Sequence, residues 1–151
     1  MTIGWIVGFI DGEGCFSVSL HKNPTTKLGW QIMPEFVATQ SEKSLDSLKV
    51  IKNFFDCGNI FVNRRYDNHK GNLYRFCVRS FNDLNEKIVP FFKKHKLKTS
   101  KSIDFELFAE IIALMSKKEH LNEKGINKII KIATKMNTGK RKHILKITSM
   151  S

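Results

Sequence analysis

The spacing of apolar residues along the chain changes from a helical to a strand-like period near Gly14. Residues 2–12 are largely apolar, and Gly4, Gly8 and Gly12 are four apart, so a helix would place them on one face. Directly afterwards, apolar residues alternate with polar ones, which predicts a half-buried strand. The core residues of this helix and strand are expected to be Trp5, Ile6, Phe9, Ile10, Phe16, Val18 and Leu20.

The glycine-rich segment has two interpretations from its residues alone. Each glycine weakens a helix by about 1 kcal/mol relative to alanine, so a helix here needs a compensating interaction. Close contact with the backbone of a second helix would provide it, because any side chain on that face would intrude. A glycine-rich strand followed by a turn fits the same residues, and the pattern does not separate the two.

Downstream, the periodicity predicts a second strand, a helix, a hairpin and further helices. The strand is expected over residues 30–39, where Pro34 favours an edge position or an irregularity. Ser41 is expected to cap a helix that ends near Phe55, and two strands then flank the turn-forming residues 67–71. A third helix capped by Asn82 and interrupted at Pro90 precedes helices over about 101–117 and 123–136. The inward strand residues are expected to be Ile32, Phe36, Ala38, Ile60, Val62, Tyr74, Phe76 and Val78.

This order, α-ββ-α-ββ-α with helices appended, predicts an α+β fold with helices on one face of an antiparallel sheet. The length of 151 residues fits a single domain spanning 1–151. We expect its core over about 2–117, with C-terminal helices and a basic tail over about 118–151.

The charge of the chain points to a polyanionic partner. It has 26 Lys and Arg against 14 Asp and Glu, a net charge of +12 and a pI near 9.8. Nucleic acid is the commonest partner of so basic a domain, although a membrane surface or an acidic protein would also be attracted. The chain lacks an apolar run of membrane-spanning length and a secretory leader pattern, so an intracellular protein is expected. Its three cysteines, Cys15, Cys57 and Cys77, are expected to be reduced, and its histidines show no zinc-ligand spacing.

The outward face of the predicted sheet carries hydrogen-bonding and cationic side chains. Arginine can bind guanine through two hydrogen bonds, and glutamine or asparagine can bind adenine in the same way. A solvated sheet face would show the same alternation, and the pattern alone leaves both interpretations open. Val37 and Phe61 are also expected to face outward. The candidate DNA-binding residues are Ser17, Ser19, His21, Gln31, Met33, Glu35, Asn63, Arg65, Arg75, Cys77 and Arg79.

Residues 6–14, IVGFIDGEG, resemble the LAGLIDADG signature of homing endonucleases. Gly8, Asp11, Gly12 and Gly14 match it directly, and Glu13 stands at the position of its second acidic residue. The expected element order over about residues 4–117 is similar to the family fold. The resemblance implies a site-specific endonuclease that hydrolyses both strands of a long, pseudo-palindromic DNA target and leaves short 3′ overhangs. It also implies divalent metal ions, Mg²⁺ or Mn²⁺, and no organic cofactor.

The resemblance assigns catalytic roles to a few residues. Glu13 would be the metal ligand, with the Gly12 carbonyl as a second contributor. Gln40 and Lys98 fall at recurrent positions of supporting active-site residues. Where some relatives carry a third, basic residue, this chain has Lys43 followed by Ser44, so that role is open.

The chain contains one copy of the motif, which the resemblance links to a homodimer joined through two motif helices. Gly4, Gly8, Gly12 and Asp11 would lie at that interface, with Asp11 also acting as a helix-end hydrogen-bonding group rather than a metal ligand. Two rivals on the same fold are an RNA-binding group I intron maturase and a DNA-binding regulator without nuclease activity. The carboxylate of Glu13 favours a nuclease over a regulator. The abundance of Lys, Ile, Asn and Phe is compatible with an organellar or bacterial source.

Overall fold

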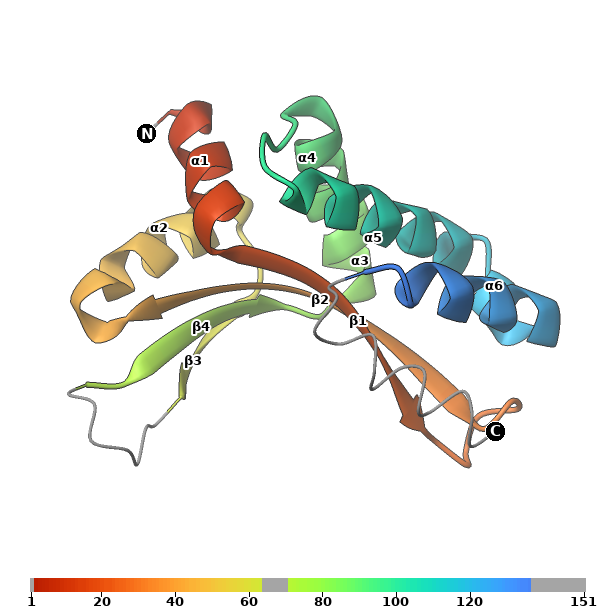
Figure 1. Ribbon diagram of the computed structural model, residues 1–151. Helices are drawn as coiled ribbons and strands as arrows, with labels where there is room; N and C mark the ends of the chain where they lie inside the picture. The colour runs from red at the N-terminus through yellow and green to blue at the C-terminus, as the bar shows by residue number, and fades with distance from the viewer. Residues whose placement is uncertain (1, 64–70, 137–151) are drawn as a thin grey trace. The chain divides into compact units, whose positions relative to one another are not determined.

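The computed structural model describes residues 2–63 and 71–136 of the chain (Figure 1). The order of elements predicted from the sequence is confirmed, and the first segment is a helix rather than a strand. The elements are α1 (Ile3–Glu13), β1 (Gly14–Lys22), β2 (Trp30–Ser41), η1 (Glu42–Ser44), α2 (Leu45–Phe55), β3 (Asn59–Asn63), β4 (Leu73–Val78), α3 (Phe81–Asp83), η2 (Leu84–Ile88), α4 (Val89–Lys94), α5 (Lys101–Ser116), η3 (Glu119–Leu121) and α6 (Glu123–Ala133).

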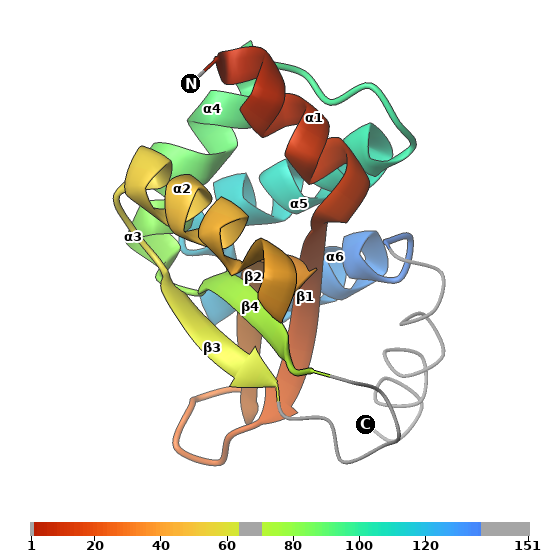
Figure 2. The ribbon, with the colours of Figure 1, turned by 90° about the vertical axis from the view of Figure 1, so that its left-hand side faces the viewer.

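The four strands form one sheet in the order β1-β2-β4-β3. Both β2 and β3 run antiparallel to β4, with Phe36 opposite Val78 and Ile60 opposite Phe76. Figure 2 shows β3 at the edge of the sheet. Val62 lies opposite Tyr74, as the predicted inner face requires, but 44% of its side chain is exposed on this edge strand.

The chain divides into two compact units. The first takes the described residues of Met1–Cys15 and Glu35–Thr99, and the second takes those of Phe16–Pro34 and Ser100–Ser151.

The core of the first unit is built around Phe36 of β2. Its ring contacts those of Phe55, Phe76 and Phe92, with centroids 6.2, 6.2 and 5.7 Å away. Burying a side chain of this size contributes roughly 1.5–3 kcal/mol, so these rings hold α2, α4 and the sheet together. α2 lies along β3 and β4 (Figure 2). Ile6 and Ile10 of α1 are fully buried, as predicted, whereas 39% of Trp5 is exposed.

Two helix boundaries in the first unit differ from the prediction. Ser80, not Asn82, caps α3, because its hydroxyl accepts the backbone N–H of Asp83. Pro90 does not interrupt the helix but lies in the first turn of α4, after the wider π-helical turn of η2. Proline lacks an N–H and its ring crowds the preceding turn, and a π-turn relieves both problems. Ser41 stands at the predicted N-cap position, directly before η1, and the structure describes no capping hydrogen bond from its side chain there.

The second unit packs Phe16 of β1 against α5. The Phe16 ring lies 5.2 Å from that of Phe105 and 5.3 Å from that of Phe108. Asn122 caps α6, because its side-chain oxygen accepts the N–H of Gly125, and this helix packs on α5. Among the helices that the structure describes, none has the length and hydropathy needed to cross a bilayer.

Candidate active site and nucleic-acid interface

The carboxylate of Glu13 is exposed at the last residue of α1. Strand β1 follows without a loop, and the Gly14 N–H closes the helix on the carbonyl of Ile10. A Cβ at Gly14 would lie 2.6 Å from Ile10 Cγ2 and 2.9 Å from Ile10 O, so only glycine fits this junction. The motif glycine therefore allows an abrupt change from helix to strand, which leaves Glu13 at the surface.

The side chain of Asp11 joins the end of α1 to the segment that follows α4. Its two carboxylate oxygens accept the Lys98 backbone N–H at 3.0 and 2.9 Å. Oδ1 also accepts the Thr99 N–H at 3.1 Å and the Thr99 hydroxyl at 2.9 Å. All of these groups lie in the first unit. Hydrogen bonds to a charged acceptor are the stronger kind, so this carboxylate fixes the backbone that carries Lys98.

The predicted catalytic residues come from three segments of the first unit. Leu97 is buried, which anchors the segment after α4, and the Lys98 side chain beside it is exposed. Because Asp11 lies two residues before Glu13, its hydrogen bonds place the Lys98 backbone near the end of α1. Gln40 is half-buried on β2, opposite Tyr74 of β4. Lys43 and Ser44 lie in η1, and the third supporting role stays a prediction.

The end of α1 carries oxygen donors of the kind that bind hard cations. Glu13 and the carbonyl of Gly12 offer oxygen atoms, which Mg²⁺ and other hard cations prefer. The described residues contain no group of three or more His, Cys, Asp or Glu that could hold a metal ion by themselves. The two oxygen donors at the end of α1 fit a divalent cation.

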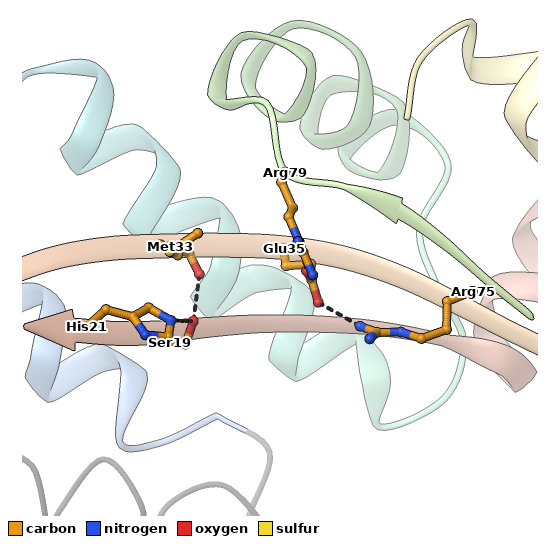
Figure 3. Close-up of polar contacts among 6 residues, drawn as sticks. All are labelled: Ser19, His21, Met33, Glu35, Arg75 and Arg79. Carbon is orange, nitrogen blue, oxygen red and sulfur yellow. Dashed lines mark hydrogen bonds and ion pairs between the residues drawn. The ribbon is translucent and has the colours of Figure 1, made fainter. Parts of the chain in front are cut away.

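On the sheet face of the first unit, Glu35 binds two arginines at once (Figure 3). Arg75 Nη2 donates to Glu35 Oε1 at 3.1 Å, and Arg79 Nε donates to Glu35 Oε2. The side chains of Glu35, Arg75 and Arg79 are 18, 33 and 55% exposed. The hydrogen bond to Glu35 raises the pKa of Arg79 above its ordinary value. We call these three residues the arginine–glutamate cluster.

Three residues that were expected to face outward are buried. Val37 and Cys77 lie opposite each other on β2 and β4, and are 8 and 3% exposed. Their neighbours on this face are the long side chains of the arginine–glutamate cluster, which account for the burial. Ser17 is 7% exposed in the second unit. These three residues are therefore covered rather than open at the surface, and burial raises the pKa of the Cys77 thiol.

The second unit contributes polar residues of β1 and β2. Ser19 Oγ lies 3.1 Å from His21 Nε2 and donates to the Met33 carbonyl at 3.4 Å (Figure 3). Gln31 is exposed, and its Oε1 accepts a hydrogen bond from Asn23 at 3.2 Å. Met33 is half-buried.

The edge of the first unit's sheet carries the last two candidates of the predicted DNA-binding set. Asn63 ends β3 and is exposed. Arg65 lies outside the described residues.

The glycine face of α1 is open. Gly4, Gly8 and Gly12 are exposed, and a Cβ added to any of them meets no atom within 4 Å in the described part of the chain. Trp5 next to them stacks on Phe9, with ring centroids 5.1 Å apart. This helix therefore presents a flat surface on which a second backbone could lie closely.

Sequence reasoning missed Thr99 and the link from Asp11 to Lys98. The two partners are 87 residues apart, and neither helical nor strand periodicity relates them. For the segment around Lys98, the sequence offered only the resemblance of that lysine to a recurrent active-site position of the family.

Comparison with known proteins agrees with this geometry. The family model described as LAGLIDADG endonuclease matches residues 6–112, so the chain belongs to this family. A curated relative, "Probable intron-encoded endonuclease 2" of Neurospora crassa, is 34% identical over 136 residues, which is 89% of this chain. The chain spans only 29% of that relative's length.

Two solved structures show the same fold. The homing endonuclease I-TnaI is 38% identical, with a TM-score of 0.88, and the match covers 99% of this chain and 97% of that one. I-SmaMI, described as bound to an uncleaved DNA target in the presence of calcium ions, is 34% identical, with a TM-score of 0.83. That match covers 91% of this chain and 45% of I-SmaMI. The predicted α+β homing-endonuclease fold is confirmed.

Proposed function

We propose that the protein is a site-specific endonuclease that hydrolyses phosphodiester bonds in both strands of duplex DNA with the aid of divalent metal ions. The observation that carries the proposal is the exposed Glu13 carboxylate at the end of an open-faced helix, beside a lysine segment fixed by Asp11. Membership of the LAGLIDADG endonuclease family supports it.

Glu13 would hold the metal ion together with the carbonyl oxygen of Gly12. When bound there, a cation such as Mg²⁺ supplies Lewis-acid chemistry, including a lower pKa for an attacking water and stabilisation of the leaving oxygen. A carboxylate is needed because its negative charge draws the cation toward the equally negative phosphate backbone. Either Mg²⁺ or Mn²⁺ suits these oxygen donors, and we propose Mg²⁺.

Lys98 and Gln40 would act beside the scissile phosphate. The exposed ammonium of Lys98 would offset the negative charge that develops on the phosphoryl oxygens, and the amide of Gln40 would orient a water molecule by hydrogen bonding. Preorganised groups contribute most to such stabilisation, because they need no rearrangement during the reaction. The hydrogen bonds from Lys98 and Thr99 to Asp11 supply that preorganisation for the backbone of the lysine segment.

The outer face of the sheet would bind the DNA. Strands can enter the major groove, where arginine donors meet guanine acceptors. The candidates are Arg75, Arg79 and Asn63 in the first unit. In the second unit they are His21 and Gln31. The net charge of +12 would strengthen binding to any DNA, and this part of the affinity should fall steeply with salt.

The open glycine face would receive a second motif helix, most simply that of a second copy of the chain. Such pairing would bring a second Glu13 next to the first and complete the metal site. A two-fold dimer would mirror a pseudo-palindromic target. Pairing would also compensate for the helix-weakening effect of Gly4, Gly8 and Gly12.

The direct test is cleavage of a library of randomised DNA duplexes with Mg²⁺, with Ca²⁺ and with EDTA. We expect one family of related, roughly palindromic sequences to be cut with Mg²⁺ and to stay intact with EDTA. Sequencing of the cut ends would show whether they carry 3′ overhangs. Absence of any cut sequence, together with selective binding of structured RNA in parallel, would contradict the proposal and favour an RNA-binding role.

A further inference from the structure

The arginine–glutamate cluster holds a carboxylate where a DNA-binding surface would ordinarily exclude one. Glu35 was expected to contact DNA itself, but both of its oxygens accept hydrogen bonds from arginines. Its side chain is also the least exposed of the three, at 18%, against 33% for Arg75 and 55% for Arg79. Arg79 therefore covers more of the outer surface than Glu35 does.

The contacts of Glu35 leave donors available on each arginine. Arg79 uses Nε and Arg75 uses Nη2, and a guanidinium has five N–H donors in a rigid, planar arrangement. A shared carboxylate also offsets the repulsion between two neighbouring positive charges. The pair is thus held in one orientation (Figure 3), rather than free to follow the nearest phosphate.

We propose that Glu35 is a specificity-determining residue, which holds Arg75 and Arg79 as one two-arginine reader of guanine edges and keeps both away from phosphates. This inference rests on the proposed binding of duplex DNA. Guanine is the expected base because its O6 and N7 acceptors match arginine donors in the major groove. Loss of the carboxylate would free the arginines to bind phosphates, which carry no sequence information.

The register of the sheet explains how these three side chains meet. Glu35 and Val37 lie on β2, and Cys77 lies opposite Val37 on β4. Arg75 and Arg79 stand two residues before and after Cys77, so their side chains meet above the buried Val37–Cys77 pair. That apolar pair excludes water from one side of the cluster. The lower local dielectric constant strengthens its ion pairs relative to fully solvated ones.

The test is the variant Glu35→Gln, compared with Glu86→Gln as a control for net charge. Glu86 is exposed in η2, and this substitution removes the same negative charge from the same unit. Binding of each protein to a randomised duplex library is measured without divalent ions, so that cleavage does not alter the pool. Equilibrium affinity for the selected target and for an unrelated duplex is then measured between about 50 and 300 mM salt, roughly a sixfold range of ionic strength.

We expect Glu35→Gln to lower the ratio of target affinity to non-specific affinity by about tenfold or more, the value of one good arginine–guanine pair. Non-specific affinity should rise. The slope of the logarithm of the binding constant against the logarithm of the salt concentration should become more negative by about 0.9 for each arginine that gains a phosphate contact. The base positions that lose preference should be those also affected by Arg75→Ala and Arg79→Ala. Glu86→Gln should leave the ratio and the base preferences unchanged.

Two results would overturn the inference. If Glu35→Gln and Glu86→Gln change the affinity ratio equally, Glu35 acts only through net charge. If Glu35→Gln affects base positions other than those of the two arginines, it contacts the DNA directly. Failure of the proposed function has a different signature, because the wild-type protein itself would then enrich no sequence, and this inference would fall with it. Thermal melting of each variant confirms that a loss of preference does not come from unfolding.

Discussion

The carboxylate of Asp11 accepts the backbone N–H of Lys98 with both of its oxygens, at 3.0 and 2.9 Å. This contact joins the acidic motif helix to the segment of the proposed catalytic lysine. It places Asp11 within its own chain's hydrogen bonding, as expected for a helix-end group, while its role at an interface between copies remains a proposal. Asp11 thus orders its own chain, and the exposed Glu13 is the proposed cation ligand.

Asp11→Asn should slow DNA cleavage by about 10- to 100-fold, as changes to groups that orient active-site residues commonly do. The amide would turn an NH₂ group toward backbone donors that need an acceptor. DNA affinity should change little, because Asp11 is not part of the sheet surface. The single-turnover cleavage rate and the equilibrium affinity for DNA are measured separately, to test whether only the rate falls.

A double-mutant cycle that combines Asp11→Asn with Lys98→Ala tests whether Asp11 affects the cleavage rate by positioning Lys98. Lys98→Ala removes the ammonium but keeps the backbone N–H that Asp11 binds. If Asp11 acts by positioning Lys98, the rate loss caused by Lys98→Ala should be much smaller in the Asp11→Asn background. Strict additivity of the two rate losses would contradict the positioning role.

Glu13→Gln should abolish metal-dependent cleavage, with a rate loss of at least about a hundredfold, while leaving affinity for DNA largely intact. The amide keeps the size of the side chain but removes the charge that attracts a cation toward phosphate. Cleavage rate at increasing Mg²⁺ concentration is the measurement, with Glu86→Gln as the charge-matched control. A Glu13→Gln protein that cuts like the wild type would remove Glu13 from the metal site.

Gly8→Leu should prevent close pairing of two motif helices. A Cβ at this exposed position meets no described atom within 4 Å, and a leucine would separate two backbones that need to approach. Sedimentation velocity should show loss of the dimer while the circular dichroism spectrum stays native. Ala113→Leu, a similar enlargement at an exposed position of α5, should leave the assembly state unchanged. A Gly8→Leu protein that dimerises normally would refute pairing through this face.

Gly14→Ala should destabilise the fold by about 1–3 kcal/mol, because its methyl group would overpack against Ile10 at 2.6 Å. Gly8→Ala is the matched comparison, since its methyl group meets open space and alanine favours a helix by about 0.5–1 kcal/mol. In urea denaturation at low protein concentration, the unfolding midpoint should therefore fall for Gly14→Ala and rise for Gly8→Ala. Equal shifts would mean that the junction between α1 and β1 relaxes to accept a side chain.

Much of the architecture was accessible from local pattern. The change of period at Gly14 marks the junction of α1 and β1, and the apolar spacing located α5 and α6 closely. The motif over residues 6–14 indicated the family, and the family model covers that segment. The helix boundaries that failed, at Ser80 and Pro90, depend on which backbone groups remain unpaired, and residue type alone does not show this.

By itself the sequence determined the order of elements, the exposed acidic end of α1 and the basic character of the sheet, because these follow from neighbours in the chain. Only the tertiary structure decided that Asp11 binds the Lys98 backbone and that Glu35 accepts hydrogen bonds from two arginines. It also decided that Val37 and Cys77 are buried. The physical reason is distance along the chain. Periodicity assigns a residue to a face, but hydrogen bonds and burial depend on which distant side chains are long enough and suitably charged to meet there.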